Sequence, residues 1–207
     1  MSDWLSREFA EAQYAVVSDE LRGIFPEPYL VFAEAMAHVT KKETLLDIGC
    51  GVGGYAFVCK KLFPETAYTG ADISKHMIWF AKRICPTATF YVRELFDNFA
   101  EGCNYDVVLT SSTIEYTPDP WEALEFLLSH ASRNLILHRL HLTGGQSHEV
   151  HELSYCGKRI NKMHWNANEV CDFIGEQRVI EHARVWANGN MLSVVLKPVG
   201  ERQQPER

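Results

Sequence analysis

Several features that are common in proteins are absent from this sequence. It has no apolar run long enough to cross a bilayer, and residues 1–8 lack the apolar core of a signal peptide. None of the six cysteines forms a Cys-x-x-Cys pair, and a chain of 207 residues can bury a core without disulfide bonds. We therefore expect free thiols in a reducing cytoplasm, a cytoplasmic protein and no membrane partner.

Positive charge is also scarce. The 20 Lys and Arg residues are outnumbered by 27 Asp and Glu residues, which gives a formal net charge of −7. Phosphate backbones are bound by basic faces, so we expect no nucleic-acid partner. The length fits one domain over residues 1–199, with a helical cap at 1–40, a core at 44–199 and a polar, disordered tail at 200–207.

Glycine gathers where an apolar strand is expected to end. Residues 45–54 read Leu-Leu-Asp-Ile-Gly-Cys-Gly-Val-Gly-Gly. Glycine has no Cβ, so this backbone can turn sharply and a ligand can lie close against it. The helix expected next would point its N-terminal amides at that ligand. Asp47, two residues before the first glycine, suits a cationic ligand group and does not suit a pyrophosphate.

The same glycines fit a second pattern. Gly49, Gly51 and Gly54 match Gly-x-Gly-x-x-Gly, the signature of dinucleotide binding. Asp72 follows about 20 residues later, where that fold has its ribose-binding acid. Asp47 separates the two interpretations, because an acid would repel the pyrophosphate of NAD. The same acid can accept a hydrogen bond from the ammonium group of S-adenosylmethionine (SAM), which has no phosphate.

The glycine segment at 45–54, taken with Gly-Ala-Asp-Ile-Ser at 70–74, resembles the class I SAM-dependent methyltransferases. The resemblance implies that SAM is the cofactor and that Asp47, Gly49 and Gly51 line its methionine part. Cys50 lies inside this turn and is interpreted as a small residue that fits there.

The resemblance also implies how the nucleoside would be held. Asp72 would bind the ribose hydroxyls and Ile73 would pack on the adenine. Glu94 would bind the adenine amino group, with Asp97 as an alternative. Two further residues after predicted strands, Leu95 and Ser111, complete the expected cofactor set.

Strands and helices are expected to alternate from residue 44. We predict strands at 44–48, 67–72, 88–93, 105–110, 134–140, 178–186 and 191–197. We predict helices at 4–20, 29–39, 53–63, 75–84, 119–131 and 167–176. This alternation indicates an α/β fold, a Rossmann-like seven-stranded, mostly parallel sheet with helices on both faces and an N-terminal helical cap. Asn-Gly within residues 187–190 predicts a hairpin, so the last strand should be antiparallel and lie beside its predecessor.

The loop at 111–120 is expected to lie beneath the transferred methyl group. It lacks the Asn/Asp-Pro-Pro-aromatic motif of enzymes that methylate planar amino groups on bases or glutamine. Its Ser-Ser and Asp-Pro pairs look like those of uncharacterised bacterial methyltransferases found with sugar and surface-polysaccharide genes. In that group, the residues that precede the glycine turn usually differ from the Asp-Ile-Gly at 47–49 of this sequence.

Five histidines lie between residues 138 and 164. His138 and His141 fall on a predicted strand, where a separation of three puts side chains on opposite faces, so we predict no metal site. A histidine can instead remove a proton near neutral pH. We predict His138 as the general base and Glu115 or Tyr116 as the group that orients the acceptor. A purely structural His138 is the competing interpretation.

The sequence therefore predicts a SAM-dependent methyltransferase that acts on a small molecule, with a hydroxyl of a sugar or natural product as the expected acceptor. The helices at 4–39 and the segment at 141–165 would cap the acceptor pocket. Two alternatives stay open, an NAD-dependent oxidoreductase and a SAM-binding protein without turnover.

Overall fold

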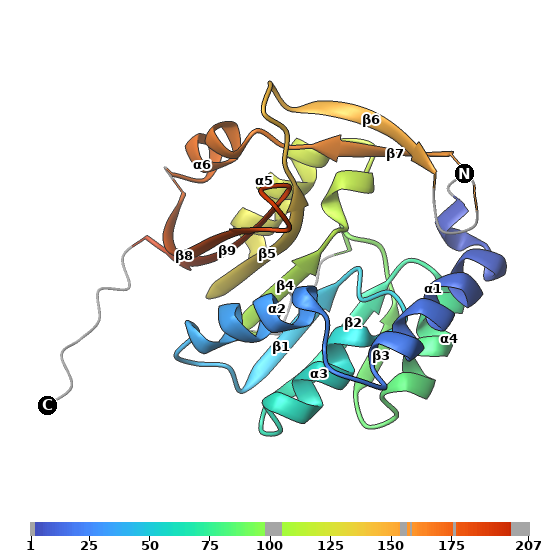
Figure 1. Ribbon diagram of the computed structural model, residues 1–207. Helices are drawn as coiled ribbons and strands as arrows, with labels where there is room; N and C mark the ends of the chain where they lie inside the picture. Colours follow the sequence, from blue (N-terminus) through green and yellow to red (C-terminus); the bar gives the residue numbers. More distant parts are fainter. Residues whose placement is uncertain (1–2, 98–104, 154–156, 158, 176, 200–207) are drawn as a thin grey trace, which may run out of the picture.

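A central sheet of seven strands lies between two sets of helices (Figure 1). The structure is a computed structural model, and it describes residues 3–97, 105–153, 157, 159–175 and 177–199. The sheet strands are β1 (Thr44–Ile48), β2 (Ala67–Asp72), β3 (Thr89–Val92), β4 (Val107–Ser111), β5 (Asn134–His141), β8 (Arg178–Trp186) and β9 (Met191–Pro198).

The sheet has the order β3-β2-β1-β4-β5-β9-β8. The pairs among β1 to β5 are parallel, whereas β9 runs antiparallel to both β5 and β8. The predicted Rossmann-like sheet with a reversed last strand is therefore confirmed. The β8–β9 connection is the expected hairpin, and Ala187, Asn188 and Gly189 all take left-handed backbone conformations in it.

The helices begin where the sequence supplies capping groups. They are α1 (Arg7–Glu20), α2 (Glu27–Ala37), α3 (Gly54–Leu62), α4 (Lys75–Ile84), α5 (Pro120–His130) and α6 (Ala167–Gly175), with short 3-10 turns η1 (Asp3–Leu5) and η2 (Ile114–Tyr116). The side chains of Ser6, Ser74 and Asp119 each accept a backbone N–H in the first turn of α1, α4 and α5. These boundaries differ from the predicted ones by a few residues, as expected for helix ends.

Each face of the sheet has its own apolar core. Alternate residues of one strand enter opposite cores, as Leu45 and Leu46 of β1 do. One core holds α2, α3 and α4 against the sheet, and the other holds α5 and α6. The ends of the strands are thereby fixed between two packed layers.

The two N-terminal helices have different positions. Phe32 and Met36 of α2 are buried in the core that covers β1, β4 and β9. In contrast, α1 packs on α4, where Tyr14 stacks on Phe80 with ring centroids 4.5 Å apart. The predicted cap therefore divides into a helix that covers the sheet and a helix that lies beside the glycine turn.

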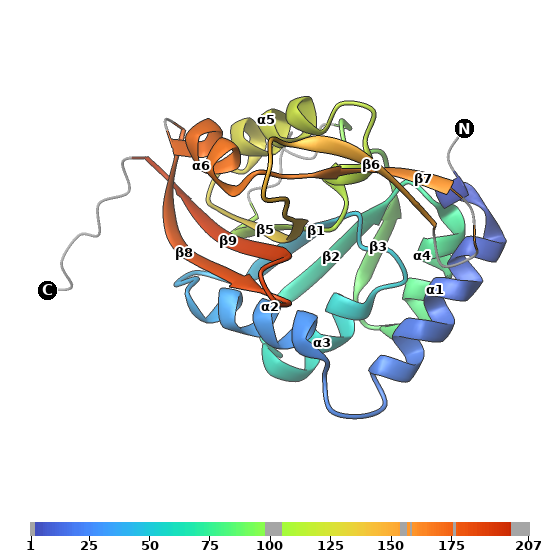
Figure 2. The same ribbon diagram turned by 45° about the horizontal axis from the view of Figure 1, so that its top comes forward.

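A two-stranded hairpin that the sequence reading did not separate into strands follows β5. It consists of β6 (His148–Leu153) and β7 (Arg159–His164), which pair antiparallel outside the main sheet. Figure 2 shows the hairpin crossing over the end of the sheet, from α6 toward η1. Trp4 of η1 packs on Tyr116 of η2, and Lys162 of β7 lies 5.8 Å from the centre of the same ring.

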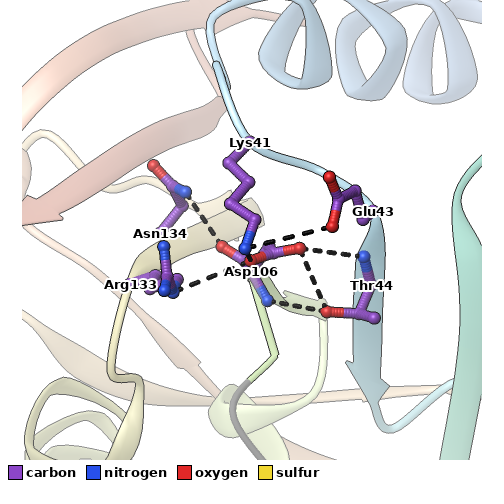
Figure 3. Close-up of polar contacts among 6 residues, drawn as sticks. All are labelled: Lys41, Glu43, Thr44, Asp106, Arg133 and Asn134. Carbon is purple, nitrogen blue, oxygen red and sulfur yellow. Dashed lines mark hydrogen bonds and ion pairs between the residues drawn. The ribbon is translucent and has the colours of Figure 1, made fainter.

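The opposite end of the sheet is held by a satisfied carboxylate (Figure 3). Asp106, just before β4, accepts hydrogen bonds from the backbone N–H and the hydroxyl of Thr44, both at 3.2 Å. Lys41 lies 3.2 Å and Arg133 3.7 Å from its other oxygen. Burial raises the pKa of Asp106, but Lys41 and Thr44 more than offset this, so the net pKa lies below its usual value.

The expected disordered tail at 200–207 lies outside the described residues. No helix in the described part of the chain combines the length and the apolar character that a membrane crossing requires.

Candidate functional site

The glycine turn between β1 and α3 has a backbone that other residues rarely adopt. Gly49, Gly51 and Gly53 have φ angles of 76°, 53° and 85°. The N–H groups of Gly49 and Cys50 both donate to the carbonyl of Ala71 on β2, at 2.8 and 3.0 Å. The turn is thus tied to the carboxyl end of the neighbouring strand, where open α/β sheets bind ligands.

Two segments from elsewhere in the chain lie against this turn. A Cβ atom on Gly49 would lie 2.2 Å from Oγ1 of Thr113, and one on Gly51 would lie 3.0 Å from Oε1 of Gln13. The Thr113 hydroxyl also donates to the carbonyl of Gly49 at 3.5 Å. The loop after β4 and helix α1 therefore border the turn directly.

Asp47 is fully buried at the end of β1. The hydroxyl of Tyr68 donates to Oδ2, while Oδ1 has no hydrogen-bond partner among the described residues. Burial raises the pKa of Asp47 to about 7, with the Tyr68 hydrogen bond opposing the rise and Asp72 adding to it. A buried carboxylate oxygen without a donor is costly, so this position favours a ligand that brings a donor or a positive charge.

Asp72 ends β2 and is held by two backbone donors. Gly51 N–H lies 3.0 Å from Oδ2, and Ser74 N–H lies 2.8 Å from Oδ1. Burial raises the pKa of Asp72 to about 6, although both hydrogen bonds lower it. The carboxylate is therefore fixed beside the glycine turn, and its oxygens keep lone pairs that can accept from hydroxyl groups. Ile73, which is 44% exposed, offers apolar surface next to it.

The other predicted cofactor residues have varied surroundings. Glu94 is exposed, and its N–H donates to Oδ2 of Asp97 at 3.1 Å. Leu95 packs partly against the core under α5. Cys50 is buried, and Ser111 is buried with its hydroxyl 3.1 Å from that of Tyr55.

His138 is enclosed on all sides. Its side chain is fully buried, its Nδ1 lies 2.7 Å from the Ser193 hydroxyl, and its ring stacks on Trp186 at 5.7 Å between centroids. Burial lowers the pKa of His138 to about 3, and the Arg139 guanidinium lowers it further, while the Pro28 carbonyl raises it. The imidazole is therefore neutral at physiological pH and is packed among aromatic rings.

Glu115 and Tyr116 lie on η2, beneath the β6–β7 hairpin. Glu115 is buried and its Oε1 lies 3.5 Å from Nδ1 of His141. Burial and the adjacent Glu115 raise the pKa of Tyr116 above its ordinary value. The structure thus brings Glu115 together with His141, whereas the partner of His138 is Ser193.

The expectation that His138 and His141 lie on opposite faces of a regular strand is wrong, because β5 contains a bulge. Arg139 has a φ of 59°, and the pairing with β9 gains one residue between Leu137 and Leu140. Leu137 and Leu140 consequently enter the same core, although they are three positions apart. The extra residue shifts the alternation, and His141 reaches Glu115.

Four residues of the site were missed by the sequence reading as functional positions: Gln13, Tyr68, Thr113 and His141. Gln13 and Thr113 lie far from the glycine turn in sequence and contact it only in the folded chain. No local sequence pattern predicts such contacts. His141 has a sequence signal, since it forms a His-x-x-His pair with His138, but regular strand alternation puts the two side chains on opposite faces.

Comparison with known proteins agrees with the fold described above. Residues 46–135 match a family model described as a methyltransferase domain, from β1 to the start of β5. This segment thus carries the pattern of a methyltransferase domain, and the chain resembles SAM-dependent methyltransferases. Two predictions, the family resemblance and the fold class, are thereby confirmed.

Relatives of this methyltransferase domain are distant. A trans-aconitate 2-methyltransferase of Escherichia coli O1:K1 / APEC is 27% identical over 114 residues, which are 50% of this chain and 45% of that protein. A malonyl-[acyl-carrier protein] O-methyltransferase 1 of Ilyobacter polytropus is 28% identical over 100 residues, 46% of this chain and 37% of that protein. The chain thus spans less than half the length of these relatives.

A solved structure has the same fold as this methyltransferase domain. The TehB-like SAM-dependent methyltransferase from Corynebacterium glutamicum superposes with a TM-score of 0.65 at 14% identity, over 93% of this chain and all of that one. At this identity the likeness concerns the fold.

Proposed function

We propose that this protein binds SAM and transfers its methyl group to a small-molecule acceptor. One observation carries the proposal. Asp47 is a fully buried carboxylate with an unpartnered oxygen, and it stands directly before the glycine turn. The ammonium group of SAM supplies both the donor and the positive charge that this oxygen lacks.

The residues at the carboxyl ends of β1, β2 and β3 fit the parts of SAM in order. The backbone of Gly49 and Gly51 would lie along the methionine part, with Thr113 and Gln13 as neighbouring side chains. Asp72 would accept from the ribose hydroxyls and exposed Ile73 would cover the adenine. When bound, SAM supplies an electrophilic methyl group on a sulfonium leaving group.

The remaining predicted cofactor residues complete this proposal. Glu94 and Leu95 would flank the adenine from the turn after β3. Ser111, at the end of β4, would lie near the methionine part together with Cys50. Among these, Glu94 is exposed and free to meet a ligand, whereas Cys50 is buried and contributes only its small size and its backbone.

We propose that the methyl group is transferred to an oxygen atom. More specifically, we propose a hydroxyl group of a sugar or natural product. The Ilyobacter relative is named as an O-methyltransferase. The likeness of the 111–120 loop to methyltransferases of sugar gene clusters favours a sugar. Together, α1 and the β6–β7 hairpin would cover this acceptor. Gln13 of α1 borders the glycine turn and Lys162 of β7 lies near Tyr116 of η2, so we treat residues 1–199 as one functional domain.

His138 fits a structural role better than that of a general base. Its enclosure by Trp186, Phe32 and Tyr55 leaves no path for an acceptor, and its lowered pKa opposes protonation at neutral pH. Tyr116 keeps the proposed role of orienting the acceptor, because its ring lies between Trp4 and Lys162.

Calorimetry with S-adenosylhomocysteine (SAH) and with NAD tests the proposal. We expect SAH to bind and NAD not to bind. Tight NAD binding without SAH binding would point to the oxidoreductase and overturn the proposal. A SAM-binding protein without turnover would also bind SAH. It would not convert SAM into SAH, whichever small-molecule hydroxyl compound is supplied.

A further inference from the structure

A buried acid and a histidine meet at the same edge of the sheet as the glycine turn. Glu115 comes from η2 and His141 from the last position of β5. Oε1 of Glu115 lies 3.5 Å from Nδ1 of His141. The Glu115 side chain has no exposed surface, whereas that of His141 is 15% exposed. Solvent therefore reaches the imidazole and does not reach the acid.

Glu115 also has a second oxygen that is buried. Its Oε2 has no hydrogen-bond partner in the described part of the chain. Among the described residues, a hydrogen bond joins this carboxylate to the His141 ring. The acid is thus positioned to fix the tautomer of the imidazole.

Hydrogen bonds of Thr113 connect this pair to the glycine turn. The Thr113 hydroxyl donates to the carbonyls of Gly49, at 3.5 Å, and of Ser111, at 3.1 Å. Glu115 stands two residues after Thr113, in the first turn of η2. The loop that borders the proposed methionine site therefore continues directly into the Glu115–His141 pair.

The backbone around the pair is unusual on both strands. Ser112, after β4, and Arg139, in β5, have φ angles of 49° and 59°, which L side chains rarely adopt. The two positions are neighbours, because the Ser112 N–H donates to the carbonyl of His138 at 3.0 Å. Uncommon conformations concentrated at one edge are typical of functional sites.

We propose that Glu115 and His141 form the acid–histidine dyad that removes the proton of the acceptor hydroxyl. Glu115 is the positioning residue, which accepts the Nδ1–H of His141. His141 is the general base, and its Nε2 is left to take the proton. This inference rests on the proposed function and moves the base from His138 to His141.

The step balances with SAM as the methyl donor. The acceptor oxygen attacks the methyl carbon, an O–CH3 bond forms and the S–CH3 bond breaks. The electron pair of the broken bond stays on sulfur, which leaves neutral SAH. The hydroxyl proton goes to Nε2 of His141 and then to water.

Other titratable groups face the Glu115–His141 pair from the β6–β7 hairpin. The ring of His164 lies 5.9 Å from that of His141, and His148 lies 6.2 Å beyond it. Lys162 pairs with Glu152 at 3.0 Å on the same face of the hairpin. Burial lowers the pKa of His164, and Lys162 and His141 lower it further. His164 therefore stays neutral and adds no positive charge next to the proposed base.

The test is the tautomer of His141, read by 15N NMR of the full chain labelled at histidine. We expect the Nδ1–H tautomer in the wild type, with His141→Gln assigning its signals. In Glu115→Leu the Nε2–H tautomer should replace it. An Nε2–H tautomer in the wild type, or a tautomer unchanged in Glu115→Leu, would overturn the dyad.

Enzyme kinetics give the second readout. A panel of methyl glycosides is first screened for an acceptor with which the protein converts SAM into SAH. His141→Gln should lower kcat at least about 100-fold with SAH affinity unchanged. The matched control His130→Gln, at an exposed position at the end of α5, should not lower kcat. If the wild type binds no SAH, the proposed function fails. If it binds SAH but shows the wrong tautomer, the dyad alone fails.

Discussion

Asp47 and Asp106 are two buried aspartates at opposite ends of the neighbouring strands β1 and β4. Asp106 has donors or cations at both oxygens, and its pKa lies below the ordinary range. Asp47 has one donor, Tyr68, and its pKa is raised to about 7. The difference shows that a carboxylate shielded from solvent becomes a structural anchor where the protein supplies its partners, and stays available to a ligand where the protein does not.

Removing the anchor should give the largest effect on stability. Asp106→Ala leaves the Thr44 donors without their acceptor and leaves Lys41 and Arg133 without a partner at this position. We expect a loss of about 3 kcal/mol in the free energy of unfolding, measured by urea denaturation. Glu43→Ala is the matched control, since Glu43 is exposed and lies 3.9 Å from Lys41. A loss under about 1 kcal/mol would contradict the assignment of Asp106 as an anchor.

Removing the charge of Asp47 should affect binding and spare the fold. Asp47→Asn loses the charge that the SAH ammonium needs, so SAH affinity should fall at least about tenfold by calorimetry. The raised pKa means that ionising Asp47 opposes folding as pH rises through about 7. The variant should therefore be as stable as the wild type at pH 8, or more stable. A marked drop in melting temperature would make Asp47 a second structural anchor.

The pH dependence of SAH binding should follow the same carboxylate. At pH 5.5 Asp47, with a pKa of about 7, is mostly protonated, and it ionises by pH 7.5. We expect SAH affinity to rise several-fold over this range, to an upper limit of about tenfold per unit below the pKa. Asp72, with a pKa of about 6, contributes in the lower half of the range. The Asp47→Asn variant should show a flatter profile, and an equal slope in both proteins would exclude Asp47 as its source.

The smallest effect concerns the enclosed histidine. Ser193 lies within hydrogen-bond distance of His138, at 2.7 Å, and accepts from Trp186, at 3.0 Å. Ser193→Ala should cost about 1 kcal/mol of stability and leave SAH binding unchanged. Lost SAH binding would show that His138 and its partners belong to the ligand site after all.

The sequence predicted best what depends on local chemistry. Strand, acid and glycines within residues 45–54 dictate their turn, because only glycine tolerates its positive φ angles. Asn-Gly between the last two strands likewise dictates the reversed hairpin. The bulge at Arg139 has no such signal, since an arginine in the left-handed region is stabilised by its surroundings and not by its own preference. The sequence alone therefore puts His141 on the face opposite His138 and gives no sign of its contact with Glu115.

The position of β9 has a consequence for the order in which the protein folds. β9 lies between β5 and β8, so β5, which carries His141, gains one of its two neighbours only after residues 191–198 have been synthesised. The glycine turn, β2 and β4 are complete more than 70 residues earlier in the chain. We therefore expect a nascent chain to form the SAM-binding half first and to acquire a competent acceptor side only when the last strand inserts.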